Sequence, residues 1–185
     1  MRILVTGGAG FIGSHVDHRL LERGHEVAIV DNLSTGKREN VPQKARFYEM
    51  DIRSGCPEVF EEFRPQVLSH QAAQMDVRHS IREPDFDADV NVLGTSRLFQ
   101  NCVEHGVRRV VFASTGGAIY GEQRKFPVPE DHLQCPISPY GVSKLARYRR
   151  GDERQPPLRA ITADFRESSP PNTAPLSQAN SSAAP

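Results

Sequence analysis

The chain has 185 residues, of which 37% are hydrophobic and 25% charged, enough for one packed domain of ordinary size but not for two. Its 23 basic and 23 acidic residues give zero formal net charge, which does not favour a nucleic-acid-binding protein, and no apolar run approaches the roughly 20 residues of a membrane span. The three cysteines and the histidines lack metal-site or disulfide spacing and the first residues lack a signal-peptide pattern, so we expect a cytoplasmic protein without a metal.

The first predicted element is a buried strand at Ile3–Val5, a β-branched apolar run bounded by glycines. A helix is expected over Phe11–Arg23, because Ile12, Val16, Leu20 and Leu21 recur at helical spacing and Gly24 follows as a stop signal. Further strands are expected at Val27–Val30, Arg46–Met50, Val67–His70 and Arg109–Ala113, with helices at Glu58–Phe63 and Asp85–His105. The last helix places an apolar series on one side, namely Phe86, Val90, Leu93, Leu98 and Cys102. This alternation predicts an α/β fold with a Rossmann-type doubly wound parallel sheet.

The composition changes near Arg147. Residues 151–185 hold six prolines, six alanines and five serines, and their few large apolar residues show no periodicity. Such a segment buries too little apolar area to offset its ordering entropy. We therefore expect a dinucleotide-binding domain at 1–147 and a low-complexity, disordered tail at 148–185.

A glycine pattern follows the first strand and opens the first helix. Gly7 permits a tight turn, Gly10 lets the backbone approach a pyrophosphate, and Gly13 lets the helix pack closely on the strand. The helix N-terminus then offers free N–H groups to phosphates. This context favours a dinucleotide site over a turn without a ligand.

Acidic residues end the next two strands. Asp31 can accept hydrogen bonds from both ribose hydroxyls and would repel a 2′-phosphate, which favours NAD over NADP. The alternative is an aspartate that caps a turn. Asp51, followed by Ile52, could meet the adenine amine, with a turn-forming aspartate as an equal alternative.

Tyr140 and Lys144 stand four residues apart, in a helix that Pro139 would begin and Ser138 would cap. An ammonium near the phenol would lower its pKa, so that the tyrosine could act as a base. The pattern also occurs by chance, but a preceding Rossmann unit makes a catalytic pair the favoured interpretation.

Two hydroxyl residues follow the fifth strand, at the edge where open α/β sheets bind ligands. Ser114 or Thr115 could relay a proton between a substrate oxygen and Tyr140, or could simply cap a turn.

These residues resemble the extended short-chain dehydrogenase/reductase family, within its NAD-dependent epimerase/dehydratase group. The resemblance rests on the segments VTGGAGFIGSH, VDNLSTG and FASTGGAIYGE, on His70–Ala73, and on Tyr140 with Lys144, and it covers about residues 1–146.

The resemblance implies roles for individual residues. The pyrophosphate would be held by the three glycines and the backbone of Phe11 and Ile12. The adenosine would be held by Asp31, Asn32, Asp51 and Ile52, and the cofactor channel would be lined by Ala72, Ala73, Asn91 and Ser114. Thr115 would be the hydroxyl partner of Tyr140, and Lys144 would orient the nicotinamide ribose. Aligning on Tyr120 would instead put Gly116 at the hydroxyl position, so Thr115 is chosen by its distance to Tyr140, with Ser114 in reserve.

The implied reaction is epimerisation at C4 of a UDP-sugar by an enzyme that can form a homodimer. A nucleotide-sugar dehydratase is an alternative, but it would favour an Asp-Glu pair where Gly116 and Gly117 stand. The family builds its substrate domain largely from a second half that we expect to be missing here. A catalytically inactive NAD-binding fragment is therefore another alternative. The abrupt change of composition leads to the hypothesis of a reading-frame shift near residue 147, which the other two frames of the gene would test.

Overall fold

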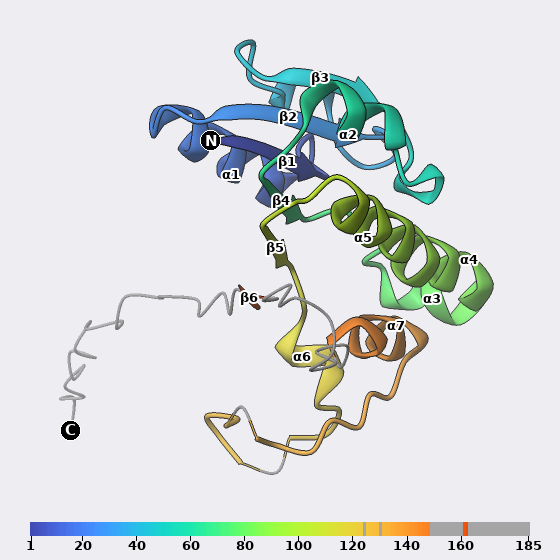
Figure 1. Ribbon diagram of the computed structural model, residues 1–185. Coiled ribbons are helices and arrows are strands. Elements are labelled where there is room, and N and C mark those ends of the chain that lie inside the picture. The colour runs from blue at the N-terminus through green and yellow to red at the C-terminus, as the bar shows by residue number, and fades with distance from the viewer. Residues whose placement is uncertain (124, 130, 149–160, 163–185) are drawn as a thin grey trace, which may run out of the picture.

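The computed structural model describes residues 1–123, 125–129, 131–148 and 161–162 and centres on a parallel sheet (Figure 1). The strand order is β3-β2-β1-β4-β5-β6, and every pair of neighbours is parallel. The strands are β1 (Arg2–Thr6), β2 (Glu26–Asp31), β3 (Arg46–Glu49), β4 (Val67–His70), β5 (Arg109–Phe112) and β6 (Ile161–Thr162). This order, which reverses beside β1, confirms the predicted doubly wound fold.

Helices connect the strands. They are α1 (Phe11–Glu22), η1 (Arg38–Asn40), η2 (Ile52–Ser54), α2 (Pro57–Phe63), α3 (Val77–Arg82), α4 (Pro84–Ala88), η3 (Asp89–Gly94), α5 (Thr95–Glu104), α6 (Gly116–Ile119) and α7 (Pro139–Tyr148). The predicted helices α1, α2 and α7 are confirmed within one residue of their expected starts. The sequence analysis missed α3 and α6, which are only six and four residues long.

Two apolar layers cover the two faces of the sheet. Alternate residues of β1 divide between them, with Leu4 on one face and Ile3 and Val5 on the other. The layer around Leu4 includes Phe60 of α2 and Leu98 of α5, both fully buried. The opposite layer packs against α1. Period-two alternation in strands buried on both sides accounts for the unbroken apolar runs in the sequence.

The buried face of α1 differs from the predicted one. Ile12 is 47% exposed, whereas Gly13 and Asp17 are buried. Neither carboxyl oxygen of Asp17 has a hydrogen-bond partner among the described residues. Burial, with a smaller contribution from the charge of Asp31, raises the pKa of Asp17 to about 8. Gly13 packs against Gly7 and Gly8 of the turn that follows β1, so the helix face that carries Gly13 and Asp17, rather than Ile12, is the buried one.

The predicted helix Asp85–His105 is interrupted by a π-helical segment, η3, between α4 and α5. Its wider turn shifts the buried face, so the predicted apolar side is only partly correct. Leu98 and Cys102 are buried as expected, but Leu93 is 49% exposed. Asn91 takes a buried position instead, at 3% exposure. Single π turns inside α-helices often occur at functional sites.

The predicted tail at 148–185 lies outside the described residues, apart from Tyr148 and residues 161–162. The latter form β6, which pairs with β5 in parallel. In the part of the chain that the structure describes, every helix is too short or too polar to cross a membrane. No group of three or more His, Cys, Asp or Glu within that part is placed to hold a metal ion.

Candidate functional site

Most of the predicted site residues follow the carboxyl ends of parallel strands. The glycine turn follows β1, Asp31 ends β2, Asp51 follows β3, and Ala72 follows β4. Ser114 and Thr115 follow β5, while Asn91 lies in η3 and the Tyr140/Lys144 pair on α7. This edge is where open α/β sheets bind ligands.

The glycine turn is packed so closely that side chains are excluded from it. Gly7 has a positive φ of 73°, and a Cβ there would lie 2.6 Å from the backbone nitrogen of Ala72. A Cβ on Gly13 would collide with the carbonyl oxygen of Gly7. The first N–H groups of α1 have no carbonyl partner within the helix. The turn therefore offers backbone donors, without Cβ atoms in the way, to an anionic group.

Asp31 holds this turn against the end of β2. One carboxyl oxygen accepts a hydrogen bond from the backbone N–H of Ala9 at 3.0 Å, and the other accepts one from the N–H of Leu33 at 2.8 Å. The side chain therefore has the turn-capping contacts of the alternative interpretation. Carboxylate oxygens can each accept more than one hydrogen bond, so these contacts leave capacity for ribose hydroxyls.

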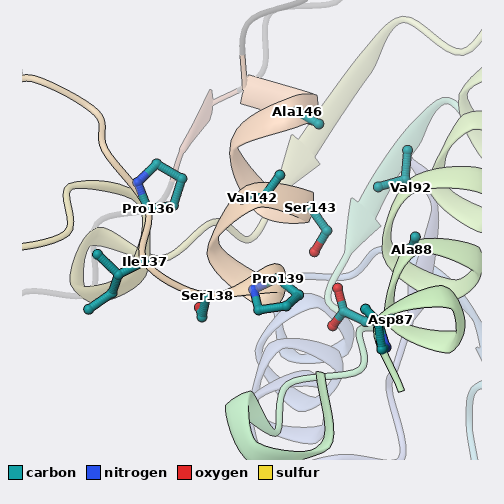
Figure 2. A pocket seen from close by; sticks show the side chains of 11 residues that line it. Asp87, Ala88, Val92, Pro136, Ile137, Ser138, Pro139, Val142, Ser143 and Ala146 are labelled. Atoms are coloured by element: carbon teal, nitrogen blue, oxygen red, sulfur yellow. The ribbon is translucent and has the colours of Figure 1, made fainter. Parts of the chain in front are cut away.

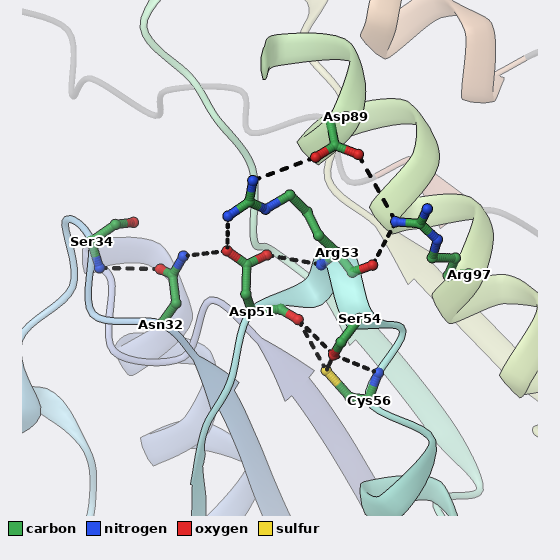
Figure 3. A network of polar contacts seen from close by, with 8 residues as sticks. All are labelled: Asn32, Ser34, Asp51, Arg53, Ser54, Cys56, Asp89 and Arg97. Carbon is green, nitrogen blue, oxygen red and sulfur yellow. Dashed lines mark hydrogen bonds and ion pairs between the residues drawn. The ribbon is translucent and has the colours of Figure 1, made fainter. Parts of the chain in front are cut away.

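Asp51 is the centre of a polar network between the β2 and β3 ends (Figure 3). Its carboxylate accepts hydrogen bonds from the Asn32 amide at 3.1 Å and from the Arg53 backbone N–H at 2.8 Å, and it pairs with the Arg53 guanidinium at 3.0 Å. Burial alone would raise the pKa of Asp51, but these bonds and the Arg53 charge lower it overall. Arg53 also pairs with Asp89 of η3 at 3.4 Å. The network joins two predicted adenosine-site residues, Asn32 and Asp51.

Asn91 joins the segment after β4 to α7. Its amide nitrogen, which carries two hydrogens, donates to the backbone oxygen of Gln74 at 2.8 Å and to the carboxylate of Asp87 at 3.0 Å, and it also lies 3.5 Å from the hydroxyl of Ser143. Its oxygen accepts a hydrogen bond from the N–H of Gln74 at 3.0 Å. Through these contacts Asn91 holds together the segment after β4, helix α4 and helix α7.

The start of α7 agrees with the prediction. The hydroxyl of Ser138 accepts a hydrogen bond from the N–H of Gly141 at 3.1 Å, so the predicted cap is confirmed. At Gly141 a Cβ would lie 2.6 Å from the Ala118 carbonyl oxygen of α6. The close approach of the two helices brings the segment after β5 next to the Tyr140/Lys144 pair.

Lys144 is a buried cation, with 4% of its surface exposed. Its ammonium donates a hydrogen bond to the Ala113 carbonyl at 3.2 Å and lies 4.9 Å from the centre of the Phe112 ring. The distance to the centre of the Tyr140 ring is 5.9 Å. Burial lowers the pKa of Lys144 to about 8, against the opposing effect of Asp87.

The pKa of Tyr140 moves in the direction opposite to that expected. Burial raises it, and the negative charge of Asp87 raises it further. Proximity of Lys144 was predicted to lower it, but the ammonium is directed at the Ala113 carbonyl. The Tyr140 phenol therefore holds its proton more firmly than a tyrosine in water.

The two candidate hydroxyls differ in their surroundings. Ser114 has a buried hydroxyl oxygen without a hydrogen-bond partner among the described residues. Thr115 is the N-cap residue of α6, with φ −146° and ψ 111°, but its side chain makes no capping hydrogen bond. The Thr115 hydroxyl therefore does not cap the turn, which was the alternative role predicted for it.

A groove of about 480 Å³ runs between α7 and the α4–η3 segment (Figure 2). Pro136, Pro139 and Val142 line one side, and Ala88 and Val92 line the other. It lies beside α7 and does not include the glycine turn, so it is distinct from the proposed dinucleotide site.

The sequence analysis missed Asp87 and Gln74. Asp87 is 1% exposed, and its carboxylate accepts a hydrogen bond from the Gln74 side chain at 3.0 Å as well as from Asn91. Asp87 stands four residues before Asn91, and residues at that spacing share one helix face. That spacing is the sequence signal from which Asp87 could have been predicted as a partner of Asn91.

A family model and curated relatives match most of this chain. A family model described as the NAD dependent epimerase/dehydratase family matches residues 3–152. A putative UDP-glucose 4-epimerase of Methanocaldococcus jannaschii is 48% identical over 143 residues, which are 77% of this chain and 47% of the relative. The chain spans about half the length of the curated relatives it matches.

Solved structures give the same picture. The UDP-glucose 4-epimerase of Thermotoga maritima, crystallised with UDP-glucose, has a TM-score of 0.77 and 50% identity, over 79% of this chain and 48% of that one. The UDP-glucose 4-epimerase of Thermus thermophilus, in complex with NAD, has a TM-score of 0.76 and 53% identity over the same shares.

Proposed function

Since this chain belongs to the NAD-dependent epimerase/dehydratase family, we propose that its residues 1–147 form the NAD-binding part of a UDP-glucose 4-epimerase-type isomerase. The observation that carries the proposal is the placement of the glycine turn, Asp31 and the Tyr140/Lys144 pair around one edge of the sheet. NAD is the cofactor and a UDP-sugar the substrate. Supporting this, similar solved structures include UDP-glucose 4-epimerases crystallised with UDP-glucose or with NAD.

The residues of the turn fit a dinucleotide. Gly7 and Gly13 leave a surface of backbone that any Cβ would fill, and the α1 N-terminus provides N–H donors for the pyrophosphate. Asp31 accepts hydrogen bonds from the adenosine ribose, and its charge disfavours a 2′-phosphate. Asn32, Asp51 and Ile52 form the adenosine end, while Ala72, Ala73, Asn91 and Ser114 line the way to the nicotinamide end.

The catalytic work of the chain falls to Tyr140, Thr115 and Lys144. Tyr140 takes the proton from the sugar 4-hydroxyl, and Thr115 provides the hydroxyl that hydrogen-bonds between sugar oxygen and phenol. Lys144 donates hydrogen bonds to the nicotinamide ribose. Bound NAD would supply a hydride acceptor and a positively charged ring. Because burial and Asp87 raise the pKa of Tyr140, the phenol needs positive charge nearby before it can act as a base.

Two titrations on the full 185-residue chain test this proposal. Because the chain has no tryptophan, NAD and NADP binding are measured by calorimetry, with Asp31→Asn as the variant and the exposed Asp85→Asn as the matched control. We expect NAD to bind and to be preferred over NADP, and we expect the preference to fall only in Asp31→Asn. A chain that binds neither cofactor refutes the proposal.

Incubation with UDP-galactose and NAD tests the reaction. Formation of UDP-glucose supports the isomerase, and NAD binding without turnover supports the inactive NAD-binding fragment instead. A 4-keto-6-deoxy sugar product would favour a dehydratase. The homodimer implied by the resemblance stays a prediction, which light scattering of the purified chain would check.

A further inference from the structure

Lys144 is buried without a direct acidic partner. Within the described part of the chain no carboxylate lies within salt-bridge distance of its ammonium, whose hydrogen bond goes to the neutral carbonyl of Ala113. A buried charge is costly unless an opposite charge or several hydrogen bonds compensate it. The ammonium therefore depends on negative charge held farther away in the same low-dielectric region.

Asp87 is placed to supply that charge. It is 1% exposed and lies on α4, which packs against α7. Its carboxyl group points across the groove toward Ser143 and Pro139 of α7 (Figure 2). The Asn91 amide donates a hydrogen bond to Asp87 and lies 3.5 Å from the hydroxyl of Ser143, which directly precedes Lys144.

The Asp87 carboxylate makes no salt bridge among the described residues. Its two side-chain hydrogen bonds come from the neutral amides of Gln74 and Asn91, each at 3.0 Å. These amides fix the carboxylate in position without neutralising its charge. The other charged groups on α3, α4 and η3 are exposed or in ion pairs, namely Arg78, His79, Arg82, Asp85 and Asp89.

We propose that Asp87 is the buried counter-charge of the Tyr140/Lys144 pair, and that it keeps Lys144 protonated near neutral pH. Asp87 is a positioning residue and not a catalytic one: its carboxylate is buried on α4, which packs against α7, and Asn91 links it to Ser143, the neighbour of Lys144 in the sequence. Its influence on the pKa of both groups agrees with this role, since its charge raises the pKa of Lys144 and that of Tyr140. The catalytic meaning of this role rests on the proposed function, whereas the electrostatic role does not.

The variant Asp87→Asn separates charge from hydrogen bonding. An asparagine in the same place keeps an oxygen that can accept from Gln74 and Asn91 but carries no charge. The pKa of Lys144 is followed in the full chain, without NAD, by the side-chain NMR signals of ¹³C-labelled lysine between pH 6 and 10.5. Lys144→Arg identifies the signal.

We expect the Lys144 midpoint to fall by about one pH unit in Asp87→Asn and to remain unchanged in the control Asp85→Asn, which removes an exposed charge from the same helix. A midpoint that is unchanged in Asp87→Asn overturns the proposal and leaves Asp87 with a hydrogen-bonding role only.

If Asp87→Asn does not fold, unfolding in urea gives a second test. Lys144→Met should be less stable than the parent, because Asp87 is then uncompensated, and the double variant Lys144→Met/Asp87→Asn should recover part of the loss. A double variant less stable than Lys144→Met overturns the proposal. Both tests omit NAD, so they are independent of the NAD titration that judges the proposed function.

Discussion

Replacing Asp17 with asparagine should remove a loss of stability that grows with pH. Burial raises the pKa of this carboxyl group from 3.8 to about 8. Between these values the native chain keeps a proton that the unfolded chain releases, so the free energy of unfolding falls as the pH rises. The slope is about 1.4 kcal/mol per pH unit. From pH 5 to pH 8 the contribution of Asp17 therefore worsens by about 4 kcal/mol.

The assay is urea unfolding of the full chain and of Asp17→Asn at pH 5, 6, 7 and 8. Asparagine has nearly the same shape and no charge, so the difference in free energy of unfolding between the two proteins should widen steadily in favour of the variant. Above pH 8 the difference should level off, because Asp17 is then ionised in both states. Asp85→Asn, on the exposed side of α4, should show a nearly constant difference from the parent. A constant difference for Asp17→Asn as well would refute the reasoning, since it would mean that Asp17 titrates normally.

Three further substitutions test other contacts. Gly13→Ala places a methyl group against the Gly7 carbonyl, so thermal unfolding should show a loss of stability of roughly 2–4 kcal/mol. The control is Gly117→Ala, whose added methyl group meets no atom within 4 Å. Equal losses of stability in the two variants would contradict the close packing of Gly13. Asn91→Ala leaves buried hydrogen-bonding groups unpaired and should lower the free energy of unfolding in urea by about 1–3 kcal/mol. An unchanged free energy of unfolding would show that Asn91 does not hold these segments together. Tyr140→Phe should leave NAD affinity unchanged in calorimetry and lower any UDP-galactose turnover about 10²–10⁴-fold; full turnover would exclude Tyr140 as the base.

Much of the fold was predictable because its signals are local. The strands β1, β2, β4 and β5 are largely apolar runs, and every end of these strands lies within one residue of its predicted limit. The segment Val77–Arg82 is mainly polar and only six residues long, too short for its single apolar pair, Val77 and Ile81, to indicate a periodicity, so α3 was missed. The π segment was missed because its hydrogen-bond pattern depends on packing between layers.

In the candidate site, too, features with a local sequence signal were predictable and features that depend on packing were not. The glycine turn, the Ser138 cap and the spacing of Tyr140 and Lys144 are short-range patterns, and the sequence shows them directly. The influence of Asp87 on that pair depends on α4 packing against α7, two elements separated by 50 residues or more. The direction of the Tyr140 pKa shift was therefore not predictable, because burial is a property of the assembled fold.

The π turn at η3 gives one continuous helix two different orientations. A π turn contains one residue more than an α turn, and an α-helix turns by about 100° per residue. If the same residues formed a regular α-helix throughout, α4 would be rotated by about that angle relative to α5. Asp87 would then turn away from α7 while Leu98 and Cys102 stayed buried. Removing one residue from Asp89–Gly94 together with the π turn would instead keep both orientations, so the extra residue and the wide turn compensate each other.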